Sequence, residues 1–382
     1  MKGYTKKIFI VAGEPSGDLH GGKLIKALKI ISPNTTFLGH GGDYMEKAGM
    51  TIIEHINNIS VMGFYEVLKH LPKILQLLKR TKKIILDLQP DHVILIDYPG
   101  FNLRLAKHLS GSNIPITYFI LPQAWAWKPK RVNDLKKFVD HNLSIFPFEK
   151  RWYESRGLIV DYVGHPFVER IHLNESFKDI YKRHNINSDF PTLVLLPGSR
   201  QQEIDKHWPI FLDTVKKLKR DFPQIQIVVG KAKGTKITNI PIDFKIEPDS
   251  NKAIIIGTAA IVASGTATLE CAISSLPMVV CYKFSLFSWW IVKLFVKIKY
   301  SSIVNLIGKK EIVPELIQSD MTPKNIVEKL TPLLNPNSNH RKTMVLQLKK
   351  IKKNLGQPGV YERAASSIIT KAFYDDKKKH IF

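Results

Sequence analysis

One carboxylate stands directly at the end of a strongly apolar run. Asp97 follows residues 93–96 and is itself followed by Tyr98, Pro99 and Gly100. A carboxylate at the carboxyl end of a buried parallel strand points into the crevice where ligands bind, and its pKa can be tuned there for proton abstraction. Asp97 is therefore the candidate general base. An aspartate ahead of Pro-Gly also suits a turn or a helix cap, so that alternative stays open.

A second group of residues has the chemistry of an anion site. Gly198, Ser199 and Arg200 follow the apolar run 193–196, where we expect a strand to end and a helix to begin. Backbone N–H groups, a hydroxyl and a guanidinium at a helix start suit a diphosphate. The alternative is a surface turn with a solvated arginine.

A third group follows another apolar run, residues 260–263. Ser264, Gly265 and Thr266 place small residues and hydroxyls at an expected helix start, where free amides and the helix dipole attract phosphate oxygens. Glu270, one turn further on, could accept hydrogen bonds from the two hydroxyls of a ribose. A capping box explains the group less well, because a leucine stands where that motif needs Glu or Gln.

Polar and aromatic residues follow two further apolar runs in the first half of the chain. The loop after the first run contains glycines that let the backbone approach a ligand, and Glu14, Ser16 and Asp18 place polar groups there. Trp125 and Trp127 could form an aromatic wall against a sugar face or an acyl chain. A turn that merely needs glycine, and a pair of core tryptophans, are the respective alternatives.

The segment 283–300 combines aromatic residues with lysines. Trp289 and Trp290 suit a membrane–water interface, and Lys293 and Lys297 suit anionic headgroups. The segment is therefore a candidate membrane contact. A core helix is the alternative.

Composition limits the class of protein. The chain has 382 residues, of which 44% are hydrophobic and 24% charged, as in globular proteins. Its net charge of +24 favours anionic partners such as nucleic acid, nucleotide substrates or an acidic membrane surface. Two cysteines fit a reducing compartment, and the short N-terminal apolar run is too short for a signal peptide. We expect a cytosolic protein that can touch a membrane.

The elements that position these residues form two α/β halves. Strand, loop and helix signals alternate in each half, which predicts doubly wound parallel sheets. Expected strands of the second half, beyond the one at 193–196, are 225–229, 253–256, 260–263 and 278–282. The expected domains are 1–170, a linker at 171–190, a second domain at 191–355, and a C-terminal helix with a basic tail at 356–382. We expect that last part to pack on the N-terminal domain or on a partner subunit.

Taken in order, these motifs resemble the lipid-A-disaccharide synthases, a family of GT-B glycosyltransferases. The landmarks that carry the resemblance are Gly13-Glu14-Pro15-Ser16-Gly17-Asp18, Val61-Met62-Gly63, Ile96-Asp97-Tyr98-Pro99, Trp125-Ala126-Trp127, Pro147-Phe148-Glu149-Lys150, Val163-Gly164-His165, Leu196-Pro197-Gly198-Ser199-Arg200, Ser264-Gly265-Thr266-Ala267-Thr268-Leu269-Glu270 and Asn305-Leu306. No single motif is diagnostic, but their order and spacing over nearly the whole chain are highly specific.

The resemblance implies two facing Rossmann-like domains with a central cleft. It implies an inverting transfer from UDP-2,3-diacylglucosamine to 2,3-diacylglucosamine 1-phosphate, without a metal or other cofactor, at the cytosolic face of an anionic membrane. Asp97 would be the base. The donor residues would be Gly198, Ser199, Arg200, Ser264, Gly265, Thr266, Glu270 and Asn305, the last in the interdomain cleft. The acceptor-side residues would be Glu14, Ser16, Asp18, Trp125 and Trp127.

Other functions remain as alternatives. One is another UDP-sugar enzyme of the GT-B type, either an undecaprenyl-linked N-acetylglucosaminyltransferase or a UDP-sugar epimerase. A basic nucleic-acid-binding protein is suggested by charge alone. It is disfavoured, because no basic and aromatic platform of a recognisable nucleic-acid module is present in the sequence. A homodimer is left open.

Overall fold

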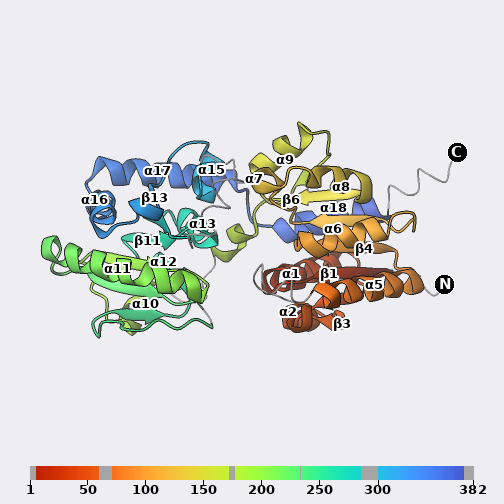
Figure 1. Cartoon of the computed structure of the whole chain (residues 1–382), viewed down its shortest axis with the longest axis horizontal. Coiled ribbons are helices and arrows are strands. Elements are labelled where there is room, and N and C mark those ends of the chain that lie inside the picture. Colours follow the sequence, from red (N-terminus) through yellow and green to blue (C-terminus); the bar gives the residue numbers. More distant parts are fainter. Residues whose placement is uncertain (1–5, 60–70, 172–176, 233, 285–299, 374–382) are drawn as a thin grey trace. The chain divides into compact units, whose positions relative to one another are not determined.

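The computed structural model describes residues 6–59, 71–171, 177–232, 234–284 and 300–373 (Figure 1). The chain divides into two compact units. The first unit comprises Met1–Pro166 and Gln357–Phe382, and the second comprises Phe167–Gly356. Each unit is a parallel sheet with helices, so the predicted pair of Rossmann-like halves is confirmed.

The first unit contains a seven-stranded parallel sheet in the order β3-β2-β1-β4-β5-β6-β7. Its strands are β1 (Lys7–Ala12), β2 (Thr36–Gly41), β3 (Thr51–His55), β4 (His92–Ile96), β5 (Ile116–Phe119), β6 (His141–Ser144) and β7 (Asp161–Tyr162). Its helices are α1 (Pro15–Ile31), α2 (Asp43–Lys47), α3 (Ile56–Ile59), α5 (Leu71–Leu88), α6 (Pro99–His108), α7 (Ala124–Trp127), α8 (Arg131–Phe138), α9 (Pro147–Glu154) and α18 (Val360–Phe373).

The second unit contains a six-stranded parallel sheet in the order β10-β9-β8-β11-β12-β13. Its strands are β8 (Thr192–Leu196), β9 (Gln226–Gly230), β10 (Lys245–Glu247), β11 (Ala259–Ala263), β12 (Met278–Tyr282) and β13 (Glu315–Ile317). Its α-helices are α10 (Phe177–Arg183), α11 (Gln201–Asp221), α12 (Ser250–Ile255), α13 (Thr266–Ile273), α15 (Ile303–Gly308), α16 (Pro323–Leu334) and α17 (Asn339–Asn354). Two 3₁₀ helices are η1 (Pro166–Ile171), at the boundary of the units, and η2 (Gln318–Asp320).

The central strands explain why these sheets are parallel and doubly covered. Every residue of β4, β8 and β11 is buried. Continuous apolar runs of this kind need cover on both faces, which helices that cross from one parallel strand to the next provide. Sequence signals also locate helix ends: the Thr322 hydroxyl accepts from the Asn325 amide at the start of α16, and Gly356 has a φ of 95° just past α17.

Two expected elements differ from the structure. Residues 253–256, expected as a strand, lie largely in helix α12, which begins where the Asp249 carboxylate accepts a hydrogen bond from the Asn251 amide. Four apolar residues alone do not distinguish a buried strand from a buried helical turn, and here the cap at Asp249 favours the helix. The segment 171–190, expected as a linker, contains α10, which belongs to the second unit.

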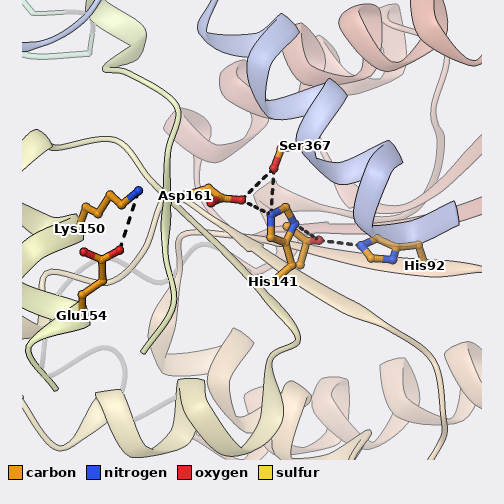
Figure 2. Close-up of polar contacts among 7 residues, drawn as sticks. His92, His141, Lys150, Glu154, Asp161 and Ser367 are labelled. Carbon is orange, nitrogen blue, oxygen red and sulfur yellow. Dashed lines mark hydrogen bonds and ion pairs between the residues drawn. The ribbon is translucent and has the colours of Figure 1, made fainter. Parts of the chain in front are cut away.

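The C-terminal helix α18 belongs to the first unit, where it packs against α1 and β6. A chain of polar side chains joins it to the amino-terminal edge of the sheet (Figure 2). The Ser367 hydroxyl donates to Asp161 and lies 3.0 Å from Nε2 of His141, which contacts Asp161 at 3.1 Å. The Thr117 hydroxyl continues the chain from Nδ1 of His141 to Nε2 of His92. These contacts lie at the edge opposite to the carboxyl ends of the strands, so they fix α18 without occupying the ligand-binding edge.

Candidate functional site

The predicted site residues lie at the same place in both sheets. In the first unit the strand order reverses between the neighbours β1 and β4, and in the second it reverses between β8 and β11. Ligands of open α/β sheets bind outside the carboxyl ends of the strands at such a switch point. The loops after β1, β4, β8 and β11 carry most of the residues that the sequence singled out.

Asp97 is the first residue after β4, and its side chain is half-buried. Burial, together with the charge of Glu14, raises the pKa of Asp97 from 3.8 to about 6. A backbone hydrogen bond from Tyr98 and the Arg131 guanidinium act in the opposite direction. A carboxylate with this pKa is ionised at neutral pH and is a stronger base than an ordinary aspartate.

The loop after β1 packs closely on the turn that contains Asp97. A Cβ atom on Gly13 would lie only 2.3 Å from Cδ1 of Tyr98, so a residue larger than glycine would displace the ring. The Tyr98 ring also stacks on Phe101, with centroids 5.8 Å apart. This close approach brings the loop, and with it Glu14, to the Asp97 side of the switch point.

The three polar residues of this loop divide into two groups. Glu14 and Ser16 are exposed, as a role in binding requires. Asp18 is only 3% exposed. Its carboxylate accepts hydrogen bonds from three backbone amides at the start of α2, those of Gly42 (2.8 Å), Tyr44 (3.1 Å) and Met45 (3.0 Å). Asp18 thus holds α2 against α1, and its expected role on the acceptor side stays a prediction.

Trp125 lies beside a buried carboxyl group that the sequence analysis did not select. The indole Nε1 donates to Oε1 of Glu149 at 3.0 Å, and the Trp125 ring meets Phe148 edge-on at 4.9 Å. Burial raises the pKa of Glu149 to about 8; hydrogen bonds from Trp125 and from backbone amides lower it in part, and the charge of Asp97 adds to the rise. The sequence signal was the place of Glu149 in the landmark Pro147-Phe148-Glu149-Lys150. The side chain of Trp127 lies outside the described part of the structure.

A pocket of about 600 Å³ opens at the switch point of the second unit. All but one of the predicted donor residues line it: Gly198, Ser199, Arg200, Ser264, Gly265, Thr266 and Glu270. Its volume is typical of small-ligand sites. The sequence analysis missed other lining residues, among them Glu203, Lys231, Asp249, Ser250 and Tyr282.

The two helix starts in this pocket differ in what they offer an anion. At α11, Oε2 of Glu203 accepts from the amides of Ser199 (3.0 Å) and Arg200 (3.3 Å), so the Ser199 amide expected to face a diphosphate already has an anionic partner. At α13, the residue before the helix is Gly265, which has no side chain to cap the first amides. The amides at the start of α13 therefore have no capping side chain from the preceding residue, while Arg200, whose side chain is 73% exposed, can turn toward an anion in the pocket.

Glu270 and Asn305 have different surroundings. Glu270 lies on the pocket wall, where it accepts a hydrogen bond from Ser250 at 3.4 Å. Asn305 is fully buried. Its amide donates to the Val313 carbonyl and the Glu315 carboxylate and accepts from backbone amides of the same loop. These contacts fix the loop between α15 and β13, and the expected role of Asn305 at the donor stays a prediction.

Some expectations fall on residues that the structure does not describe. Trp289, Trp290, Lys293 and Lys297, the candidate membrane contact, lie outside the described residues. Within the described part, no helix has both the length and the apolar character needed to cross a membrane. The same part contains no group of three or more His, Cys, Asp or Glu side chains placed to hold a metal ion.

Comparison with known proteins agrees with this geometry. A calicheamicin glycosyltransferase has a similar fold, with a TM-score of 0.61, 12% identity, and 98% of this chain and 99% of that one covered. The UDP-GlcNAc 2-epimerase of Neisseria meningitidis bound to UDP-GlcNAc has a TM-score of 0.60, 11% identity, and coverage of 97% and 100%. The fold and the pocket thus define a GT-B protein with two Rossmann-like units.

The sequence comparisons identify the family. Residues 8–370 match the family profile described as lipid-A-disaccharide synthetase. The lipid-A-disaccharide synthase of Myxococcus xanthus is 37% identical over 371 residues, which cover 95% of this chain and 97% of that protein. The chain belongs to the lipid-A-disaccharide synthase family, and so to the glycosyltransferases of lipid A biosynthesis.

Proposed function

We propose that this protein transfers the 2,3-diacylglucosamine of its UDP derivative to the 6-hydroxyl of 2,3-diacylglucosamine 1-phosphate. The products are the β-1,6-linked disaccharide 1-phosphate and UDP. Family membership supports this reaction. The structural observation that carries it is the pocket of the second unit, where an uncapped helix start, an exposed arginine and a carboxylate line one cavity.

The donor is α-linked and the product β-linked, so the transfer is a single inverting displacement. Such a step needs a base that takes the proton of the acceptor hydroxyl and positive groups that stabilise the departing diphosphate. We assign the base to Asp97. Its half-buried position and a pKa of about 6 suit this role, because the carboxylate is ionised at neutral pH and gains a proton readily.

The second unit binds the UDP part of the donor. The α13 amides and the Arg200 guanidinium would hold the diphosphate, and Glu270 would accept from the ribose hydroxyls. Glu203 supports this arrangement, because it caps α11 and lies 3.6 Å from Arg200. The charge left on the leaving UDP is then shared between a helix start and a guanidinium, which need no rearrangement of solvent during the step.

The first unit binds the acceptor. Glu14 and Ser16 are exposed on the loop beside Asp97, and Trp125 offers an indole held in place by Glu149. An indole fixed by a hydrogen bond at its nitrogen presents an apolar face, which suits a sugar ring or the start of an acyl chain.

Product analysis tests the reaction directly. The purified enzyme is incubated with the defined UDP donor and the acceptor phosphate, and the products are examined by mass spectrometry. We expect one disaccharide 1-phosphate and one UDP per turnover, with no disaccharide when the acceptor is omitted. Conversion of a UDP-sugar to its epimer, without use of the acceptor, would contradict the proposal and favour the epimerase alternative.

We also propose that the enzyme works at the cytosolic face of an anionic membrane. Both substrates carry acyl chains, and the net charge of +24 favours an anionic surface. Replacing Trp289 and Trp290 by Ser and Lys293 and Lys297 by Gln should weaken binding to anionic vesicles, since each lysine near such a surface contributes about 1 kcal/mol. The control replaces two exposed lysines of α17, Lys349 and Lys350, by Gln. Equal binding by the two variants, or loss of folding in the first, would contradict a membrane contact at residues 283–300.

A further inference from the structure

The turn that presents Asp97 has an unusual backbone. Asp97 and Tyr98 have φ values of 45° and 47°, so two consecutive residues other than glycine adopt left-handed conformations. A residue in this conformation is strained and persists only when its surroundings hold it. The contacts that hold this turn are therefore part of how the carboxylate is presented.

Two buried side chains bind the carbonyl oxygen of Asp97. The Tyr118 hydroxyl donates to it at 2.6 Å, and Nδ2 of Asn102 donates to it at 2.8 Å. Nδ2 of Asn102 also lies 3.1 Å from the carbonyl oxygen of Ile96, the last residue of β4. The Asp97 amide donates to the Phe119 carbonyl at 3.0 Å, which completes the connection between the turn and β5.

Both donors are closed off from solvent. Tyr118 and Asn102 are fully buried. Oδ1 of Asn102 has no hydrogen-bond partner among the described residues, so the side chain contributes through its amide hydrogens, which face the turn. Burial holds the pKa of Tyr118 far above its ordinary value, so its hydroxyl remains a donor at any pH used in an assay.

We propose that Tyr118 and Asn102 are positioning residues, which hold the left-handed turn so that the Asp97 carboxylate stays half-buried beside Glu14. The inference rests on the proposed role of Asp97 as base. It assigns two residues to the reaction that touch no substrate and act only through the backbone of the residue that does. A misplacement of about 1 Å in a catalytic group can reduce the rate about 100-fold.

The test replaces Tyr118 by Phe, which removes one hydroxyl and keeps the ring. We expect kcat to fall at least about 10-fold while the affinity for UDP is unchanged. When the turn relaxes, the Asp97 carboxylate gains water. The acid limb of the kcat profile, the pH at which kcat falls on the acidic side, should therefore move from near 6 toward the ordinary aspartate range.

Tyr153→Phe is the matched control. Tyr153 is also fully buried in the first unit, and its hydroxyl also donates to a backbone carbonyl, that of Pro122. We expect both variants to lose similar thermal stability, but only Tyr118→Phe to move the acid limb. An unchanged acid limb and kcat in Tyr118→Phe would overturn the inference, as would the same change in both variants. If Tyr118→Phe does not fold, Asn102→Ser replaces it, with the same measurements and the same expected and contradicting results.

A third variant separates this inference from the proposed function. Turnover retained by Asp97→Asn would overturn the role of Asp97 as base, and this inference with it. An inactive Asp97→Asn beside a normal Tyr118→Phe would overturn the positioning role and leave the base in place.

Discussion

The turns after β4 and after β11 occupy equivalent places in the two sheets, since each follows the strand across the switch point from the first strand of its unit. The first turn presents Asp97 on a strained left-handed backbone and continues into a helix that begins with Pro99, which has no N–H. The second turn consists of Ser264 and Gly265 and continues into a helix that its preceding residue, a glycine, does not cap. One topology thus supports the base that we propose in one unit and the anion site that we propose in the other.

With the roles proposed above, the chemical step depends on one turn and nucleotide binding on the other. A base needs a defined position and a raised pKa, and both come from burial and a constrained backbone. An anion site needs unpaired donors, and these come from small residues at a helix start. Variants in the two turns should therefore affect different measurements.

The largest expected effect follows from Asp97→Asn. The amide cannot take the proton of the acceptor hydroxyl, so kcat should fall by about 10²–10⁴ while the fold is kept. In the unchanged enzyme, kcat should fall as the pH drops below about 6, because Asp97 becomes protonated. Steady-state turnover across pH 5–8 measures both effects. Asp87→Asn, the same change on the exposed face of α5, is the control, and equal activity in the two variants would return Asp97 to the role of a turn residue.

The next effect concerns the second turn and its neighbour Arg200. Arg200→Ala should weaken UDP binding by about 1.5–3 kcal/mol, because charge-assisted bonds to the diphosphate are lost. Calorimetric titration with UDP gives the affinity. Arg220→Ala removes the same charge from an exposed position at the far end of α11 and should bind UDP normally. An unchanged affinity in Arg200→Ala would place its guanidinium in solvent.

The last effect concerns stability rather than turnover or binding, and it sharpens the account of the first unit. The folded-state pKa of Glu149 is raised from 4.5 to about 8, so its contribution to stability is full below pH 4.5 and is lost as the pH rises to 8. The loss is at most about 1.4 kcal/mol per pH unit. Glu149→Gln should remove this slope, as measured by thermal melts from pH 5 to 8. Glu154→Gln is the control. Glu154 is exposed on the same helix (Figure 2), so its replacement should leave the pH dependence of stability unchanged. A slope that persists in Glu149→Gln would mean that its carboxyl is ionised in the folded protein.

The sequence predicted the two turns because apolar runs that end in polar loops show where buried strands end. It did not predict the contacts that these and other residues make with groups distant in sequence. Asp18 and Asn305 look like ligand-binding residues in their motifs, but their partners lie 24–27 and 7–10 residues away and are backbone groups and a carboxylate. The same holds for Glu149, whose partner Trp125 lies 24 residues earlier, and for Tyr118, whose hydroxyl meets Asp97.

The prediction of a strand at residues 253–256 was wrong for a more local reason. Residues 253–256 have the composition of a strand, but Asp249 caps a helix ahead of them, and the short apolar run then packs as one helical turn. Strand length and composition give no warning of a cap four residues upstream, so this element could be assigned only from the structure.

The separation of chemistry from nucleotide binding is tested most directly by titrating UDP into Asp97→Asn and the unchanged enzyme. If Asp97 belongs only to the chemical step, the two proteins bind UDP with the same affinity, although one has lost its turnover. A loss of UDP affinity in Asp97→Asn as large as that in Arg200→Ala would contradict the account, because Asp97 would then belong to the donor site.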